Sequence, residues 1–220
     1  MKAMILAAGR GERMRPLTDH TPKPLLLVGG KPLIVWHLER LAQAGFKDVV
    51  INHAHLGTQI EAALGNGAQW SLRIQYSPEV TALETAGGIA NALPLLGDEP
   101  FLVINGDVFT DMDFAHIKLA EDCLAHLVLI DNPPQHPQGD FVFENGQIKP
   151  EGAVKLTFSG VGVYHPNLFA EVKRGEPAKL APLLRQEIAD NKASAEYFQG
   201  VWHDIGTPER LAALNRQLLD

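Results

Sequence analysis

Short apolar runs alternate with longer stretches of helical periodicity through much of the chain. We expect strands at residues 4–7, 49–51, 72–76, 101–104 and 127–130, where apolar side chains are continuous or alternate. We expect helices at residues 32–44, 56–64, 85–93 and 114–123, where apolar side chains recur near helical spacing. This alternation predicts a three-layer α/β/α fold around a mostly parallel, twisted central sheet.

The regular alternation of strand and helix patterns ends after residue 131. Residues 132–139 are rich in proline and other turn formers, and residues 141–143 followed by Asn145-Gly146 predict a β-hairpin. Further strands are expected at residues 161–164 and 194–198, and further helices at residues 179–189 and 208–218. Because linkers are short, we expect a single domain over residues 1–220, with one half at about residues 1–110 and the other at about residues 111–220.

The loop after the first strand carries the strongest chemical signal. Gly9 and Gly11 leave backbone N–H groups unshielded by side chains. Four cations surround the same turn: Arg10, Arg13, Arg15 and Lys23. Bare amides and fixed positive charge predict a polyphosphate site. The loop is not a P-loop, which would close on Gly-Lys-Ser/Thr, and it lacks the third glycine of the dinucleotide-binding fingerprint.

The pattern Leu-Ala-Ala-Gly-x-Gly-x-Arg-Met-x-Pro-Leu-Thr, followed by Pro-Lys-Pro, resembles the signature of the sugar-nucleotide nucleotidyltransferases. These enzymes join a nucleoside triphosphate to a sugar 1-phosphate and release pyrophosphate. The resemblance implies a Rossmann-like nucleotidyltransferase domain, in which the first half binds the nucleotide and the second half the sugar. It implies nucleotide binding by Ala8, Gly9, Gly11, Glu12, Arg13 and Lys23, and catalytic roles for Arg15 and Lys23.

Two carboxylates stand where the resembled family holds Mg²⁺. Asp107 follows the apolar strand at residues 101–104, and ligands of open α/β sheets bind at the carboxyl ends of strands. Asp204 lies in Trp-His-Asp-Ile-Gly-Thr-Pro, which looks like the family's late Trp-x-Asp-x-Gly-Thr element. The resemblance implies that Asp107 and Asp204 bind Mg²⁺ together. The structural alternatives are an Asx turn at Asp107 and a helix start capped by Thr207.

The base and sugar contacts are implied less specifically. The segment Leu-Glu-Thr-Ala-Gly-Gly at residues 83–88 resembles the family's base-binding turn, which implies that Glu79 and Gly87 contact the nucleotide. A helix start with packing glycines explains the same residues, and Glu84 departs from the common form. The resemblance implies sugar contacts by Asn105, Gly139 and Asp140. The family's Glu-Lys-Pro sugar clamp is not visible, which suggests an unusual sugar.

The composition of the chain limits the kinds of binding partner that we expect. The net charge of −7 disfavours general binding to nucleic acid or anionic membranes. The lone cysteine, Cys123, excludes an intrachain disulfide and suits a core position at a helix end. No signal-peptide pattern or bilayer-length apolar run is visible, so we expect a cytoplasmic protein. The oligomeric state is not predicted.

Within the family, the short chain without hexapeptide repeats most resembles the N-acetylmuramic acid 1-phosphate uridylyltransferases of bacterial cell-wall recycling. This implies UTP and N-acetylmuramic acid 1-phosphate as substrates, and no C-terminal β-helix. Mannose 1-phosphate guanylyltransferase and glucose 1-phosphate thymidylyl- or uridylyltransferase remain alternatives. So do a cytidylyltransferase for choline phosphate and a non-catalytic nucleotide-sugar sensor, although a sensor would tend to lose the metal carboxylates or the lysine.

Overall fold

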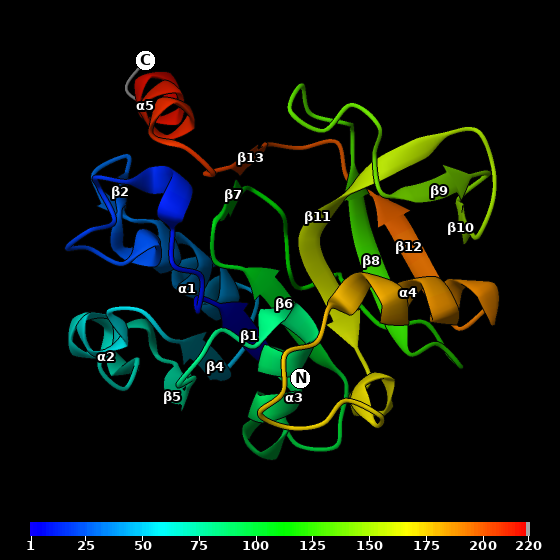
Figure 1. Cartoon of the computed structure of the whole chain (residues 1–220), viewed down its shortest axis with the longest axis horizontal. Coiled ribbons are helices and arrows are strands. Elements are labelled where there is room, and N and C mark those ends of the chain that lie inside the picture. The colour runs from blue at the N-terminus through cyan, green and yellow to red at the C-terminus, as the bar shows by residue number, and fades with distance from the viewer. Residues whose placement is uncertain (219–220) are drawn as a thin grey trace.

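The computed structural model describes residues 1–218. Its first half is a block of four parallel strands in the order β5-β4-β1-β6, part of a nine-stranded sheet in the described chain (Figure 1). These strands are β1 (Lys2–Leu6), β4 (Asp48–His53), β5 (Arg73–Pro78) and β6 (Phe101–Asn105). The central strands are buried on both sides because helices cover both faces of the sheet.

Alternate residues of β1 show how the two faces are filled. Ala3 and Ile5 point into one core, with α1 (Leu33–Gln43) and α2 (Gly57–Leu64), whereas Met4 points into the other. That second core is covered by α3 (Glu84–Leu96) and α4 (Leu180–Ala189). The predicted three-layer α/β/α fold is therefore confirmed.

The second half joins the sheet through one long antiparallel strand. The strand β11 (Lys155–Tyr164) pairs with β6, with β8 (Ala125–Ile130) and with β9 (Phe141–Glu144). The strand β12 (Ala193–Tyr197) extends β8 in parallel, and β10 (Gln147–Lys149) closes the predicted hairpin with β9. The sheet thus changes from parallel to mixed at the β6–β11 boundary.

Two short ribbons and the last helix complete the domain. The first ribbon joins β2 (Leu27–Val28) to β3 (Lys31–Pro32), and the second joins β7 (Val108–Thr110) to β13 (Trp202–Asp204). The final helix, α5 (Pro208–Gln217), begins as expected, because the Thr207 hydroxyl accepts a hydrogen bond from the Arg210 N–H. These pieces share a third core that brings the end of the chain back to the first loop.

One predicted element is wrong. Residues 114–123 form turns and irregular backbone, not a helix, so Cys123 lies half-buried in a turn. Phe114 and Ile117 are nevertheless buried in the core beneath α1 and α2. These two residues are three positions apart, which is also the spacing of neighbouring residues on one face of a helix. Their packing against the sheet, and not a helical backbone, accounts for their burial. The other predicted helices and strands are present with shifted ends. No helix in residues 1–218 is long and apolar enough to cross a membrane.

Candidate active site

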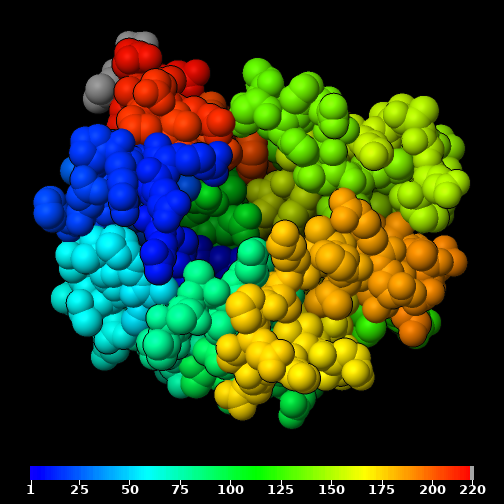
Figure 2. Space-filling view, in the orientation of Figure 1, coloured from blue at the N-terminus to red at the C-terminus, as the bar shows by residue number. Residues whose placement is uncertain are grey.

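A large cavity opens between the first loop and the carboxyl ends of β1 and β6. Figure 2 shows a hollow between the first residues of the chain and the second half. The cavity has a volume of about 630 Å³. Several predicted nucleotide and metal residues line it: Gly9, Gly11, Glu12, Arg13, Lys23 and Asp107. The first loop and the end of β6 therefore meet around one space, as the predicted phosphate site requires.

The first loop is closed on itself by local contacts. Gly11 has a left-handed φ of 63°, and its carbonyl accepts a hydrogen bond of 2.7 Å from the Thr18 hydroxyl. A Cβ at Gly11 would lie 2.9 Å from the Thr18 Cγ2, so a larger residue would strain both the backbone and the contact. The 3-10 turn at Glu12–Met14 follows, with Met14 fully buried in the third core. The loop thus reaches the cavity in a preorganised form.

Lys23 and Asp107 form an ion pair at the wall of the cavity. The Lys23 Nζ lies 2.8 Å from the Asp107 Oδ2, and the lysine side chain is only 11% exposed. Pro22 and Pro24 flank Lys23 at the start of a 3-10 turn and restrict its backbone. A cation and a carboxylate are therefore held together at the wall of the cavity where the phosphate site is predicted.

The two acids predicted to bind metal lie on paired backbone segments. Asp204 is opposite Val108 in the β7–β13 ribbon, and the Ile205 N–H donates a 2.9 Å hydrogen bond to the Asp107 carbonyl. Both acids line a side cavity of about 270 Å³. Asp204 is also ion-paired with Arg210 of α5. Residues almost a hundred positions apart in the sequence are thus brought together by one hydrogen-bonded ribbon.

The donor chemistry of this pair fits a magnesium ion. Carboxylate oxygens are the hard ligands that Mg²⁺ prefers, and it commonly takes one or two of them together with substrate phosphates and water. Within residues 1–218, no group of three His, Cys, Asp or Glu residues could hold a metal. Asp107 and Asp204 would therefore supply only part of a metal site, which substrate oxygens would complete.

His37 contributes no charge near this pair at neutral pH. It lies on α1, fully buried, and desolvation lowers its pKa to about 4. The positive charge of Arg40 acts in the same direction, whereas the negative charge of Asp107 opposes the shift. The charge of Asp107 is therefore balanced by Lys23 and not by the histidine.

A smaller cavity of about 190 Å³ lies on the other side of the first loop. Ala8, Gly9 and Glu79 line it, as predicted for nucleotide contacts, together with Asn52. The Asn52 Oδ1 accepts a hydrogen bond of 2.9 Å from the Ala7 N–H, and its Nδ2 donates one of 2.7 Å to Glu79. This buried network ties the first loop to the ends of β4 and β5.

The predicted sugar side is built around Asn105 and Asp140. Both line a cavity of about 280 Å³ that is distinct from the large cavity but shares Thr85 and Asn105 with it. A Cβ at Gly160, whose φ is 80°, would lie 2.6 Å from the Asn105 Nδ2. Asp140 accepts a hydrogen bond of 2.8 Å from the Phe158 N–H. One strand of the second half, β11, therefore contacts both side chains.

Comparison with known proteins identifies the family. A family model described as Nucleotidyl transferase matches residues 2–220. The chain belongs to this family. It is 59% identical over 220 residues to the N-acetylmuramate alpha-1-phosphate uridylyltransferase of Neisseria meningitidis serogroup B, covering 96% of this chain and 95% of that protein. The protein of the same name from Caulobacter vibrioides is 34% identical over 238 residues, covering 99% and 97%. The prediction from the first loop is confirmed.

More distant relatives carry other names. The mannose-1-phosphate guanylyltransferase of Mycobacterium tuberculosis is 30% identical over 224 residues, which cover 94% of this chain and 61% of that protein. A solved structure described as a glucose-1-phosphate thymidylyltransferase from Bacillus anthracis has a TM-score of 0.87 at 23% identity, covering 100% and 96% of the two chains. That likeness concerns the fold alone. The family match and the two uridylyltransferases show that the chain is an enzyme that transfers nucleotidyl groups.

Three predicted site residues of this nucleotidyl transferase lie apart from the cavity walls. Arg15 is exposed and its Nε lies 3.4 Å from the Asp19 Oδ1, pointing to solvent and not into the large cavity. Gly87 packs against the backbone of residues 176–178, and Gly139 against the side chain of Asn132. The two glycines thus have structural positions that let neighbouring segments approach closely.

Other residues at the cavities were missed from the sequence. Asn52 was not predicted as a site residue, although it follows a predicted apolar strand in the same way as Asn105. Lys179 and Arg185, which line the sugar-side cavity, come from the start and the middle of α4. Their chain positions carry no glycine or strand-end signal, because the packing of α4 alone brings them to the site.

Proposed function

We propose that this enzyme transfers the uridylyl group of UTP to N-acetylmuramic acid 1-phosphate, releasing pyrophosphate and forming the UDP-sugar. The supporting observation is that the glycine loop, Lys23 and Asp107 line one cavity, and that Asp204 lines an adjoining side cavity which shares Arg13 and Asp107 with it. The choice of UTP and of an acidic sugar is supported by the 59% identical relative. We also propose a cytoplasmic role in peptidoglycan recycling, where these substrates would be available.

The reaction we propose is an in-line displacement at the α-phosphorus. An oxygen of the sugar 1-phosphate forms the new bond, while the bond to the bridging α–β oxygen breaks and pyrophosphate leaves with that electron pair. Neither step needs a covalent bond to the protein. Catalysis then consists of holding the two phosphates in line and neutralising their charge.

Different residues would position the substrates and neutralise the charge of their phosphates. The backbone N–H groups at Gly9 and Gly11, with Arg13, would hold the triphosphate, and Lys23 would contact the α-phosphate. Asp107 and Asp204 would hold Mg²⁺, which supplies further charge neutralisation to the phosphates when bound. Glu79 and Asn52 would contact the base, while Asn105 and Asp140 would orient the sugar.

Arg15 keeps a proposed role at the outer rim. Its side chain lies outside the large cavity and is 62% exposed, so it is free to turn. We propose that it releases Asp19 and holds the leaving pyrophosphate when nucleotide is bound. Its weak surface ion pair would cost little to break.

A substrate panel tests the proposal. Pyrophosphate release is measured with UTP, GTP, dTTP and CTP against the 1-phosphates of N-acetylmuramic acid, mannose and glucose, and against phosphocholine. We expect the highest kcat/KM with UTP and the muramic acid derivative, and no turnover after removal of Mg²⁺ with EDTA. A preference for GTP with mannose 1-phosphate, for CTP with phosphocholine, or turnover of no pair, would overturn the assignment.

A further inference from the structure

A positively charged cavity opens beyond the sugar side of the active site. It has a volume of about 200 Å³ and lies between the β9–β10 hairpin, the start of β11 and the face of α4. Three cations line it, Lys149, Lys155 and Arg185, with apolar walls from Phe141 and Ile188. The chain as a whole carries a net charge of −7, so three cations around one hollow oppose the overall sign. Such a local excess favours an anionic ligand.

Two of the three cations have no acidic partner in the structure. Within residues 1–218, no carboxylate lies within ion-pair distance of Lys155 or Arg185. Lys149 lies 3.8 Å from Glu144, which is a loose pair. Arg185 and Lys155 are therefore available to a ligand, and a guanidinium can grip a carboxylate with two parallel hydrogen bonds.

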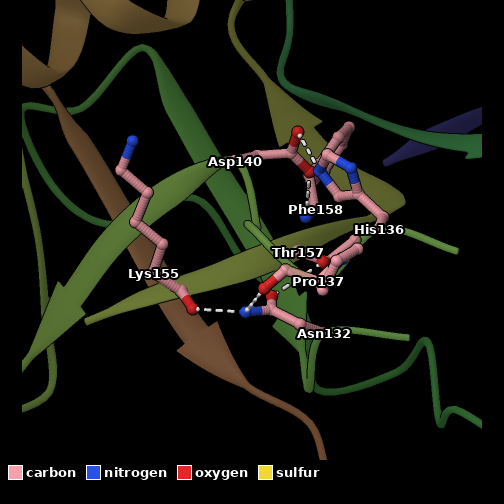
Figure 3. Close-up of polar contacts among 7 residues, drawn as sticks. All are labelled: Asn132, His136, Pro137, Asp140, Lys155, Thr157 and Phe158. Atoms are coloured by element: carbon pink, nitrogen blue, oxygen red, sulfur yellow. Dashed lines mark hydrogen bonds and ion pairs between the residues drawn. The ribbon is translucent and has the colours of Figure 1, made fainter. Parts of the chain in front are cut away.

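The carboxylate of Asp140 lines the same cavity, and each of its oxygens already makes one contact within the protein. Its Oδ2 accepts the Phe158 N–H at 2.8 Å, and its Oδ1 lies 3.0 Å from the His136 Nε2 (Figure 3). Lys155 extends to the same side of the sheet, and its own carbonyl is held by the Asn132 Nδ2 at 2.9 Å (Figure 3). The Asp140 carboxylate thus contacts a backbone N–H and a histidine. The backbone of Lys155 is held by Asn132, while its ammonium group forms no ion pair within residues 1–218.

The cavity is continuous with the place where the sugar would bind. Asp140, Phe141 and Arg185 line both this cavity and the 280 Å³ cavity on the sugar side. That middle cavity in turn shares Thr85 and Asn105 with the large phosphate cavity. A substrate with a phosphate at one end and a second acidic group at the other would span the three in order.

We infer that Lys155 and Arg185 form a subsite for a carboxylate carried by the sugar substrate. This inference rests on the proposed function, since muramic acid differs from other N-acetylhexosamines by a lactyl ether that ends in a carboxylate. The subsite makes the enzyme select an acidic sugar 1-phosphate over a neutral one of the same size. Its contribution is to affinity and specificity, because it lies away from the reacting phosphorus.

The test compares the acid with its own uncharged amide. N-acetylmuramic acid 1-phosphate and the derivative whose lactyl carboxylate is a primary amide are assayed with UTP and the complete enzyme. We expect the wild-type enzyme to have a higher kcat/KM for the acid than for the amide. In the double variant Lys155→Gln, Arg185→Gln, we expect this ratio of kcat/KM values to be about tenfold lower, mainly because KM for the acid rises. Arg185→Lys retains the charge but loses the bidentate geometry, so an intermediate loss is expected.

Control and contrary outcomes separate this inference from the proposed function. Lys47→Gln, which removes an exposed cation before β4, should leave the preference unchanged. An equal ratio of acid to amide in wild type and the double variant would overturn the subsite while leaving the uridylyltransferase assignment intact. A wild-type enzyme that ignores the muramic acid derivative but accepts another sugar would instead overturn the proposed function. Circular dichroism checks that the double variant is folded.

Discussion

The two halves of the molecule build their parts of the site in different ways. In the nucleotide half, the groups proposed to bind phosphate come from one continuous segment, residues 9–23, at the end of a parallel strand. In the sugar half, the contacts come from separate elements: the hairpin, β11, β13 and α4. A parallel strand followed by a loop can carry a complete local motif, whereas an antiparallel, mixed sheet assembles its pocket from distant segments.

This difference has a physical basis in connectivity. The carboxyl ends of parallel strands lie at one edge of the sheet, so each loop that follows a strand reaches the same space. An antiparallel strand such as β11 runs the other way, and only its pairing with β6 and β8 sets which of its residues face the substrate. We expect changes in the nucleotide half to act mainly on turnover, and changes in the sugar half mainly on KM for the sugar.

The largest expected effect is at the boundary of the two halves. Asp107→Asn keeps the size of the side chain but removes the charge that balances Lys23 and would bind Mg²⁺. We expect kcat to fall about a thousandfold, by analogy with the loss of one strong electrostatic contact in a transition state. Steady-state pyrophosphate release measures this, with circular dichroism to verify the fold. Asp98→Asn, an exposed position after α3, is the matched control, and retention of wild-type kcat in D107N would break the metal assignment.

A second prediction compares a buried histidine in each half. His126, in the sugar half, lies within hydrogen-bond distance of Ser194 and Glu196. His37, in the nucleotide half, is fully buried, and burial is the main cause of its lowered pKa. The folded-state pKa of His37 is about 4, below the value of 6.5 expected when unfolded. Between these values the unfolded chain binds more protons, so the contribution of His37 to stability is present above about pH 6.5 and is lost as the pH falls toward 4.

The measurement is urea unfolding at pH 7 and pH 4.5. His37→Leu should reduce the fall in unfolding free energy between these two pH values by about 3 kcal/mol at most. His116→Leu, which removes an exposed histidine, is the matched control. An unchanged pH dependence in the His37 variant would contradict the assignment of a neutral, desolvated imidazole.

Lys23→Ala tests the cationic part of the nucleotide half. The variant removes the ammonium that lies 2.8 Å from Asp107 and faces the phosphate cavity. We expect kcat/KM for the nucleotide to fall about a hundredfold, because one charged contact to the transition state is lost. Initial rates over a range of UTP concentrations measure the change. Lys31→Ala, which removes a cation paired with Glu39 outside the cavities, should retain wild-type rates, and similar values for both variants would count against the role of Lys23.

The smallest expected effect is in the sugar half. Gly160→Ala places a methyl group 2.6 Å from the Asn105 side chain, so that side chain must move. We expect KM for the sugar 1-phosphate to rise about tenfold, equivalent to about 1.4 kcal/mol, with little change in KM for UTP. Gly146→Ala is the matched control, because Gly146 also has a positive φ but has open space around it. If both variants raise the KM equally, backbone strain and not the position of Asn105 is responsible.

Much of the fold was predictable from local patterns. The strands and helices of the nucleotide half follow from apolar runs and helical periodicity, and the hairpin follows from Asn145-Gly146. Residues 114–123 were mispredicted because Phe114 and Ile117 have helical spacing while long-range packing holds them in an irregular segment. Periodicity reports which side chains are buried, and it leaves open which backbone form buries them.

The candidate site, like the fold, was predictable only in part from the sequence. The sequence by itself determined the family, the glycine- and cation-rich first loop and the two candidate metal-binding acids, because these are short motifs whose chemistry depends on residue type and local spacing. Only the tertiary structure decided that Asp204 lies beside Asp107, that Arg15 faces solvent, and that Lys155 and Arg185 share a cavity. These relations depend on strand pairing and helix packing across many residues, which no local pattern in the chain records.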